Sequence, residues 1–375
     1  MKRLLLCAFL SHGAFTLVSA SPVAADTPAA IHSATEFLIS SAAPAHMDTA
    51  TSGVYTRMQA LPGVLIGSGY HEHIGPNGHW RLGYPMAMEE WGARFGSLPA
   101  CFEFELGEHR RKACERDWFS ARIFARQGGL PVFALVMNNM SVPFELHQSG
   151  SAWDRRNGLF PVLPGGDAHD SFVRYIRTLA GEFRAFGHPC LFRPFHEMNG
   201  TWFWWCGNPD GYRVLWWKIF DIFRQEGIRN VIWCWNPDWG RTLPGGIESS
   251  IDYYPGDTYV DVLAADIYCN ESVFPSYGEE VVRFLNGIAP TKPIFLGEFG
   301  PVARADFWGS FPDRIRLLPR IRGIMLWMGR GWDSWGSDPE RGSLIDETTP
   351  DDIREAFRNF LDADSSITLD EWTHR

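Results

Sequence analysis

Eight short apolar runs recur along the chain, and they constrain its fold more than any other feature. Each run is bounded by Pro or Gly, and most begin about 30–40 residues after the previous one. Runs of this length are typical of buried strands. They begin near Val64, Cys101, Pro131, Cys190, Val231, Val262, Ile294 and Ile324.

Helical patterns fill most of the intervals between these runs. Apolar residues recur at three- and four-residue spacing over 114–127, 170–186, 212–226 and 353–362. Weaker patterns predict helices over 84–95, 279–286 and 311–318, whereas 240–257 is predicted mostly as loop and 138–166 as a long loop. Eight β/α units predict an α/β chain folded as a single (β/α)8 TIM barrel.

An open, doubly wound sheet is the alternative architecture. That fold needs a Gly-rich phosphate turn after its first strand, and the segment GSGYHEHIG at 67–75 is too irregular to form one. We therefore expect the barrel to span 61–364. A signal peptide at 1–25 and a lead-in at 26–60 precede it, and a C-terminal tail at 365–375 follows it.

The two flanking segments carry little predicted structure. The lead-in is rich in Ala, Ser and Thr, and it predicts one short helix near 55–61. The sequence DADSSITLDE at 362–371 resembles a calcium-binding loop, but Ile367 stands where such a loop requires Gly and the final Glu is missing. We therefore expect no metal in the tail.

The N-terminus and the charge of the chain indicate where it acts. Lys2 and Arg3 precede the apolar run 4–10, and small residues at 23–25 offer a cleavage site. We expect a protein that is secreted or periplasmic after signal-peptide cleavage, with no later membrane span. A net charge of -10 argues against nucleic acid or an anionic membrane as partner. We expect a monomer.

Removal of the signal peptide leaves six cysteines, in a compartment that allows disulfides. They are Cys101, Cys114, Cys190, Cys206, Cys234 and Cys269, and their spacing shows no metal-ligand pattern. Cys206 and Cys269 both fall in predicted loops after strands and are the best candidate pair. Cys190 and Cys234 are expected as buried thiols.

The segment PCLFRPFHEMNGTWFWWCG at 189–207 carries the strongest chemical signal. Its apolar start breaks into Arg193, His196, Glu197 and Asn199, and charged groups at a strand end are costly to bury without a purpose. Aromatic residues follow at 202–205. Flat rings stack on sugar faces, and poor solvation raises the pKa of a carboxylic acid, so the segment suits a sugar site.

Two alternatives compete with a sugar site in this segment. His196 and Glu197 could open a zinc HExxH helix, but the fifth position is Gly200 and the second ligand is missing. A purely structural ion pair between Arg193 and Glu197 is the second alternative. We favour a catalytic carboxylate over both.

A barrel of this kind has its active site at the C-terminal ends of the strands. The later strands deliver Trp235, Asn236, Asp238, Asp266, Tyr268, Glu298 and Trp327 to that end. Glu197 and Glu298 would face each other across the mouth, a pair that suits glycoside hydrolysis. Gly297 and Gly300 flank Glu298 and leave room for a ligand. We expect at least one of Trp202, Trp205 and Trp235 to line a sugar subsite.

Four segments together resemble glycoside hydrolase family 26. They are FRPFHEMNGTWFWWCG, NVIWCWNPD at 230–238, YYPGDTYVDVLAADIY at 253–268 and KPIFLGEFG at 292–300, and their order and spacing agree over roughly 60–362. The resemblance implies a retaining (β/α)8 enzyme with its catalytic glutamates on the fourth and seventh strands. It implies no metal and no organic cofactor.

The resemblance also implies roles for individual residues. Glu197 corresponds to the acid/base and Glu298 to the nucleophile, while Tyr268 corresponds to the tyrosine that hydrogen-bonds the nucleophile. His196 matches the residue that contacts the sugar beside the acid/base, and Arg193 matches the arginine of the same motif. Trp202 and Trp327 match aromatic platforms. A retaining enzyme would hold its two carboxyl groups about 5–5.5 Å apart.

One departure from the family bears on the substrate. Members that cut β-1,4-mannan carry a Trp-His pair after the third strand, and lichenase-like members carry Trp-Glu-Pro. This chain has ALVMNNMSVP at 134–143, with neither. We expect a polysaccharide substrate, with β-1,4-mannan first. A β-1,3-1,4-glucanase, a xylanase, an exopolysaccharide hydrolase and a non-catalytic polysaccharide-binding barrel are the alternatives.

Overall fold

A computed structural model describes most of the chain from residue 44 onward. The described residues are 44–69, 73–74, 80–81, 83–107, 111–142, 152, 154–240, 243–268, 274–299, 304–318, 320–326 and 350–374. The predicted signal peptide and most of the lead-in lie outside them, as do Cys269, Gly300 and Trp327.

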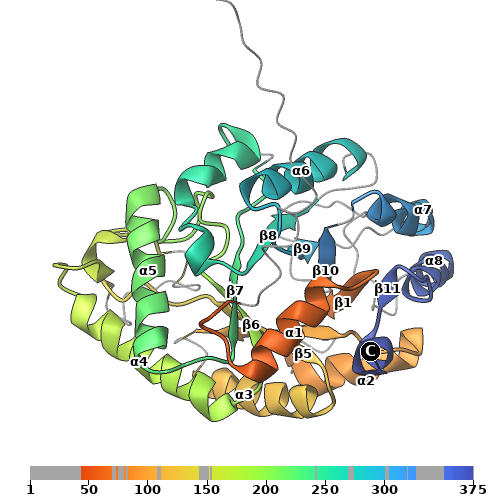
Figure 1. Cartoon of the computed structure of the whole chain (residues 1–375), viewed down its shortest axis with the longest axis horizontal. Helices are drawn as coiled ribbons and strands as arrows, with labels where there is room; N and C mark the ends of the chain where they lie inside the picture. The colour runs from red at the N-terminus through yellow and green to blue at the C-terminus, as the bar shows by residue number, and fades with distance from the viewer. Residues whose placement is uncertain are drawn as a thin grey trace, which may run out of the picture. The chain divides into compact units, whose positions relative to one another are not determined.

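Eight parallel strands form a closed barrel (Figure 1). Each strand pairs with the next along the chain, and β10 pairs with β1, so the sheet has no open end there. The strands are β1 Val64–Ser68, β4 Cys101–Leu106, β5 Leu130–Leu135, β6 Cys190–Pro194, β7 Val231–Trp235, β8 Val262–Ile267, β9 Ile294–Phe299 and β10 Ile321–Leu326. The predicted (β/α)8 barrel is confirmed, and an open doubly wound sheet is excluded.

Helices pack around the outside of the barrel and across its N-terminal end. They are α1 Thr49–Gln59, α2 Gly83–Phe95, α3 Arg111–Arg126, α4 His169–Phe186, α5 Pro209–Gln225, α6 Glu279–Ile288, α7 Ala305–Arg316, α8 Asp351–Leu361 and α9 Leu369–His374. Each helix predicted from apolar spacing overlaps one of these. A small antiparallel hairpin, β2 His73–Ile74 and β3 Trp80–Arg81, follows β1.

The segment between β7 and β8 differs from the loop predicted there. It contains η6, a 3-10 helix over Gly246–Tyr253. Ile247, Ser250 and Tyr253 are its buried residues, and their three-residue spacing matches the three residues per turn of a 3-10 helix. The remaining short elements are η5 Phe160–Val162, η7 Asp257–Tyr259 and η8 Phe274–Gly278.

The N-terminal end of the barrel is closed by apolar side chains. Inward residues such as Leu65 and Leu191 form one cluster with Met58 of α1 and Trp372 of α9. The tail also contributes β11 Ser366–Ile367, which pairs in parallel with β1. The tail is therefore part of the barrel, and Ile367 is buried in the sheet rather than in a cation loop.

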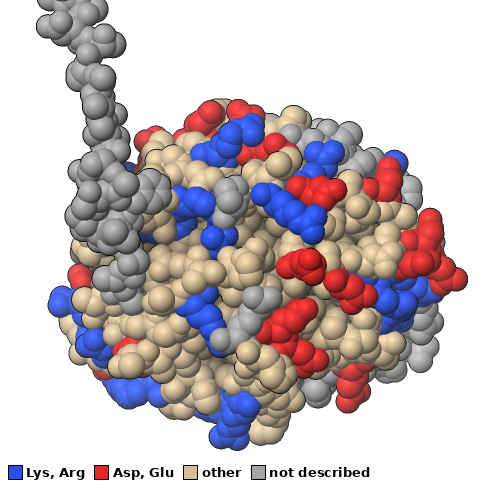
Figure 2. Space-filling model, turned by 45° about the vertical axis from the view of Figure 1, so that its right-hand side comes forward, with Lys and Arg blue, Asp and Glu red and all other residues tan. Residues whose placement is uncertain are grey.

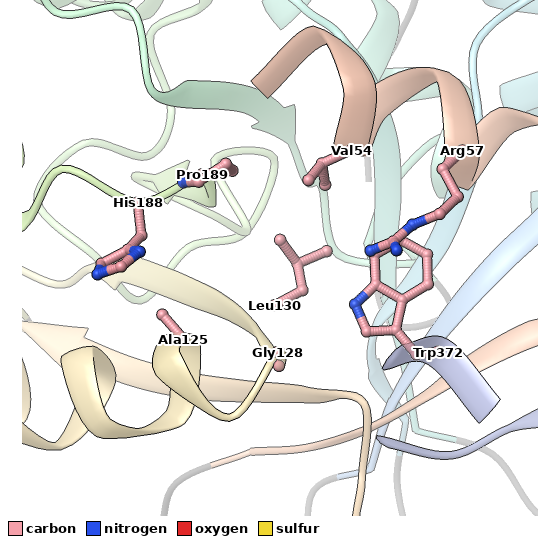
Figure 3. A pocket seen from close by; sticks show the side chains of 9 residues that line it. Val54, Arg57, Ala125, Gly128, Leu130, His188, Pro189 and Trp372 are labelled. Atoms are coloured by element: carbon pink, nitrogen blue, oxygen red, sulfur yellow. The ribbon is translucent and has the colours of Figure 1, made fainter. Parts of the chain in front are cut away.

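A pocket of about 110 Å³ lies at this same end (Figure 3). It is lined from α1, α3, α9, the start of β5 and the residues that precede β5 and β6. The guanidinium carbon of Arg57 lies 3.3 Å from the ring centroid of Trp372. The lining residues include none of those predicted to act on substrate. The pocket is thus separate from the C-terminal strand ends, where the site was expected.

The cysteines, the helices and the surface charge bear on three predictions made from the sequence. Cys101, Cys190, Cys206 and Cys234 are buried free thiols, so the pairing of Cys206 is not formed. None of the described helices is both long and apolar enough to cross a membrane. On the face shown in Figure 2, basic and acidic side chains are interspersed, and no continuous basic patch covers it.

Candidate active site

Arg193 lies at the centre of a buried polar cluster inside the C-terminal end of the barrel. Its side chain is 1% exposed and points inward from β6. Nη2 donates to Glu103 Oε2 and to Glu298 Oε1, both at 2.7 Å, and Nη1 donates to Asp266 Oδ1 at 3.2 Å. Burial alone would lower the pKa of the Arg193 guanidinium, but the three carboxyl groups outweigh it and raise that pKa.

Glu298 reaches this cluster because β9 is irregular at its end. In the pairing with β8, Ala265 opposes Leu296 and Asp266 opposes Glu298, so Gly297 is skipped. A bulge of this kind re-aims the following side chain, here into the barrel. Arg193 and the Tyr268 hydroxyl then donate to different oxygens of Glu298, so both carboxyl oxygens are engaged.

Gly297 serves a different purpose from the one expected. A Cβ at this position would lie 1.7 Å from Asn236 Oδ1 and 2.9 Å from Asp266 Oδ1. The space that Gly297 leaves is therefore taken by protein side chains rather than by a ligand. Only glycine allows Asn236 to approach the β9 backbone this closely.

Glu197 is positioned by a strained turn that follows β6. Phe195 and Glu197 have φ values of 53° and 54°, in a region of backbone conformation that residues other than glycine rarely adopt. The Glu197 amide donates to Asn236 O at 2.8 Å, and Trp202 Nε1 donates to Glu197 Oε2 at 2.6 Å. The first bond fixes the backbone of Glu197 and the second fixes its carboxyl group. The residue is half-buried.

The surroundings of Glu197 favour its protonated form. Burial raises the pKa of this carboxyl well above its usual range, and the charges of Glu298 and Asp238 raise it further. The Trp202 hydrogen bond acts in the opposite direction but does not outweigh them. Burial likewise raises the pKa of Asp238 to about 7. The surroundings therefore allow Glu197 to hold a proton at a pH where an ordinary carboxyl group has lost it.

His196 contacts the other glutamate. Its Nε2 lies 3.6 Å from Glu298 Oε1, and its Nδ1 is buried without a partner among the described residues. Burial lowers the pKa of this imidazole well below its usual range, and the nearby Arg193 adds to the effect. His196 is therefore neutral and carries one unused polar atom in the site.

Asn199 links two loops of the site. Its Nδ2 donates to Asp238 O at 2.9 Å, and its Oδ1 accepts from the Asp238 amide at 2.8 Å. The Asp238 carboxyl in turn accepts from the Gly240 amide at 2.7 Å. Asn199 thus fixes the loop after β7 to the loop after β6, and both of its side-chain groups are occupied by protein.

The predicted tryptophans divide into two groups. Trp205 and Trp235 are both 0% exposed, so in this structure neither ring can stack on a sugar. Trp205 instead donates to His196 O at 2.8 Å, and Trp235 packs edge-on against Tyr254. Trp202 is half-buried beside Glu197 and remains available. Trp327 lies outside the described residues.

One group of described residues has the composition of a cation site. Ligand atoms of His196, Glu197 and Asp266 lie within 4.8 Å of one another. Both Asp266 oxygens already accept hydrogen bonds from the Arg193 guanidinium, at 3.2 and 3.3 Å. A cation at this point would sit beside a buried positive charge, so the group does not fit a metal ion.

Glu103 was not among the predicted site residues, and Asn236 was expected at the strand ends without an assigned role. Glu103 is 3% exposed and Asn236 is 1% exposed, and both contact the Arg193 side chain. The signal for Glu103 was present in the run CFEFEL, where a charged residue alternates with Phe. Such a residue on a strand buried on both faces needs a partner inside the barrel.

Comparison with known proteins agrees with this architecture. The family model for glycosyl hydrolase family 26 matches residues 99–312, which is more than half of the chain. The chain belongs to this family.

Two relatives from Bacillus subtilis share the name mannan endo-1,4-beta-mannosidase. A mannan endo-1,4-beta-mannosidase of Bacillus subtilis strain 168 is 34% identical over 245 residues, which are 62% of this chain and 62% of that protein. A second Bacillus subtilis mannan endo-1,4-beta-mannosidase is 29% identical over 208 residues, 52% of this chain and 53% of that protein. The chain thus spans between about half and two thirds of the length of these relatives.

A solved structure supports the fold. The modular endo-beta-1,4-mannanase from Cellulomonas fimi superposes with a TM-score of 0.70 at 21% identity, covering 88% of this chain and 78% of that one. At this identity the likeness concerns the barrel alone.

Proposed function

We propose that this chain is a retaining endo-β-glycanase with Glu298 as nucleophile and Glu197 as acid/base. The observation that carries the proposal is the contrast between the two carboxyl groups. Glu298 accepts hydrogen bonds on both oxygens, from Arg193 and from Tyr268, which fix its carboxyl group in place. Glu197 is held where its pKa is raised, which favours its protonated form.

The first step would be a displacement at the anomeric carbon. Glu298 forms a bond to that carbon as the glycosidic C–O bond breaks, and Glu197 transfers its proton to the departing oxygen. Once Glu298 is esterified, its charge is gone, so one of the charges that raise the pKa of Glu197 beyond the effect of burial is removed. The two carboxyl groups are thus coupled in the direction that the second step needs.

In the second step Glu197 acts as base. It takes a proton from a water molecule whose oxygen attacks the anomeric carbon, and the ester bond to Glu298 breaks. Glu298 returns as a carboxylate to Arg193 and Tyr268, and Glu197 is protonated again. Inversion at each step leaves the product with the configuration of the substrate.

The proposed substrate is a β-linked polysaccharide, with β-1,4-mannan first. This choice rests on the names of the Bacillus subtilis relatives. The residues after β5 do not indicate which polysaccharide is preferred. Asn139 is fully used in holding the loop, because its Nδ2 donates to Asp154 O and Arg156 O. Asn138 Oδ1, in contrast, is buried without a partner among the described residues. A mixed-linkage glucan is the second candidate.

A substrate panel with product stereochemistry tests the proposal. Purified protein is incubated with mannan, lichenan, xylan and bacterial exopolysaccharides, and reducing ends are measured. For the best substrate, ¹H NMR follows the first anomer released. We expect the β-anomer first. Release of the α-anomer first contradicts the retaining mechanism, and no cleavage of any β-glycan contradicts the activity.

Export and assembly form a separate part of the proposal. Residues 1–25 would be removed on secretion, and the mature protein would act as a monomer. Intact-mass measurement of exported protein should give the mass of a chain whose first residue is Asp26. Exported protein that still carries Met1 contradicts cleavage, and a dimer in light scattering contradicts the monomer.

A further inference from the structure

Glu103 shares a single guanidinium nitrogen with Glu298. Nη2 of Arg193 donates to Glu103 Oε2 and to Glu298 Oε1, each at 2.7 Å. The side chains of the three residues are between 1% and 7% exposed. The position of the nitrogen that binds Glu298 is therefore fixed from the opposite side by Glu103.

The strand register explains how Glu103 can reach Arg193. Glu103 lies on β4 and Arg193 on β6, with β5 between them. The β5 residue opposite Arg193 is Ala134, and Val132 is opposite Glu103. The small Ala134 side chain leaves the interior open between the two longer ones.

The remaining contacts of Arg193 cannot replace Glu103. Nη1 is held by Asp266 at 3.2 Å and lies 3.5 Å from Asn236 Oδ1, and Nε has no partner among the described residues. Without Glu103, Nη2 would be held only by Glu298 itself. The guanidinium plane could then turn about Nη1 together with the Glu298 carboxyl group, because Nη2 would have no other described acceptor.

The charges of the cluster are consistent with a neutral Glu103. Three carboxyl groups surround one guanidinium, and burying two uncompensated negative charges is costly, so the cluster retains protons. Burial and the charge of Glu298 raise the pKa of Glu103 to about 7, against the opposing effect of Arg193. A protonated Glu103 still offers a carbonyl oxygen to Nη2.

We propose that Glu103 is a positioning residue for the nucleophile: its acceptor oxygen holds Nη2 of Arg193 where it binds Glu298. The role belongs to the acceptor and to the shape of the side chain. This inference deepens the proposed function and rests on Glu298 being the nucleophile.

Two variants of nearly equal size separate the acceptor from packing. Glu103→Gln keeps an acceptor oxygen, whereas Glu103→Met fills the same space without one. With an aryl β-glycoside whose leaving group needs no protonation, we expect Glu103→Met to lower kcat at least about tenfold, with KM changed less than about threefold. Glu103→Gln should stay within about threefold of wild type in both.

A buried carboxylate elsewhere provides the matched control. Asp261 is 2% exposed, lies just before β8 at the other end of the barrel, and accepts from the Trp233 amide at 2.8 Å. Asp261→Asn should lower the melting temperature and leave kcat and KM unchanged. Circular dichroism of all three variants shows that the kinetic changes arise in folded protein.

Crystal structures of the two Glu103 variants supply a readout independent of activity. The hydrogen bond from Arg193 Nη2 to Glu298 should persist in Glu103→Gln and be lost in Glu103→Met. The inference is overturned if both variants keep this bond, or if Gln and Met impair kcat equally. A wild-type protein that cleaves no glycan refutes the proposed function instead, and the two crystal structures still decide the role of Glu103.

Discussion

The ends of β6 and β9 each present one glutamate to the same space, but they do so by different means. Glu197 follows β6 on a turn with positive φ, half-buried, with a neutral indole as its side-chain donor. Glu298 lies within β9 on a bulge, 5% exposed, with a guanidinium and a phenol as donors. The comparison teaches that two side chains of one residue type receive different surroundings from the backbone geometry and the donors of their strand ends.

Replacing Glu298 with Ala should have the largest effect on this comparison. No covalent intermediate can form without it, so kcat should fall at least about 10⁴-fold on polysaccharide and aryl glycoside alike. Initial rates on both substrates measure the loss. A variant that retains more than about a hundredth of wild-type activity on either would show that Glu298 is not the nucleophile.

Replacing Glu197 with Ala should separate the two strand ends more sharply. We expect kcat on polysaccharide to fall about 10³-fold, while the first step on an activated aryl glycoside is spared. The glycosyl-enzyme should then accumulate on Glu298, because the second step has lost its base. Mass spectrometry of the trapped protein locates the adduct.

Azide provides the matched rescue for that variant, since it is a nucleophile that needs no base. It should speed turnover of the Glu197→Ala protein and yield a β-glycosyl azide. An adduct on any residue other than Glu298, or an α-configured azide, would contradict both assignments.

A smaller effect is expected from Trp202→Phe, which removes the indole donor to Glu197. That donor favours the charged carboxylate, so its loss should raise the pKa of Glu197 further. Activity requires the protonated acid and declines as pH rises through its pKa, so the alkaline limb of kcat/KM should move to higher pH, by up to about one unit.

Trp217→Phe is the control for this change. Trp217 is also half-buried and donates through Nε1, but to Pro255 O at 2.8 Å on the outside of the barrel. It should leave the pH profile in place. A shift of the alkaline limb to lower pH in Trp202→Phe would mean that Trp202 stabilises the protonated acid.

Much of the architecture follows from patterns that are local in sequence. The eight apolar runs and the helical spacings predict the barrel because each β/α unit repeats the same alternation of buried strand and amphipathic helix. The strand-end rule then brings Arg193, His196, Glu197, Tyr268 and Glu298 to one place, and the structure does gather them.

The orientation of Glu298 could not be obtained in the same way. Phe295 points into the barrel, while Leu296 and Phe299 point outward. Plain alternation from Phe295 would turn Glu298 outward, and only the bulge at Gly297 turns it inward. Bulges depend on pairing with neighbouring strands, which a run of residues does not encode by itself.

The exposure of individual tryptophan rings is the second feature that could not be predicted from the sequence. Trp205 and Trp235 stand beside the catalytic strand ends in sequence, yet both rings are completely covered. Their exposure is decided by what packs on them, namely Phe203 stacked on Trp205 and Tyr254 against Trp235. Composition identifies an aromatic-rich site but does not say which rings face the ligand.

The pairing of β11 with β1 has a consequence for how the protein is made. Leu65 leaves the ribosome early, whereas Ile367, which pairs with it, and Trp372, which covers the interior, come at the far end of the described chain. Contacts so distant in sequence form late, so a nascent chain keeps the N-terminal end of its barrel exposed until residues 366–372 have left the ribosome. A chain cut just before Ser365 would therefore behave as an arrested folding intermediate, and chaperones and proteases would recognise it as one.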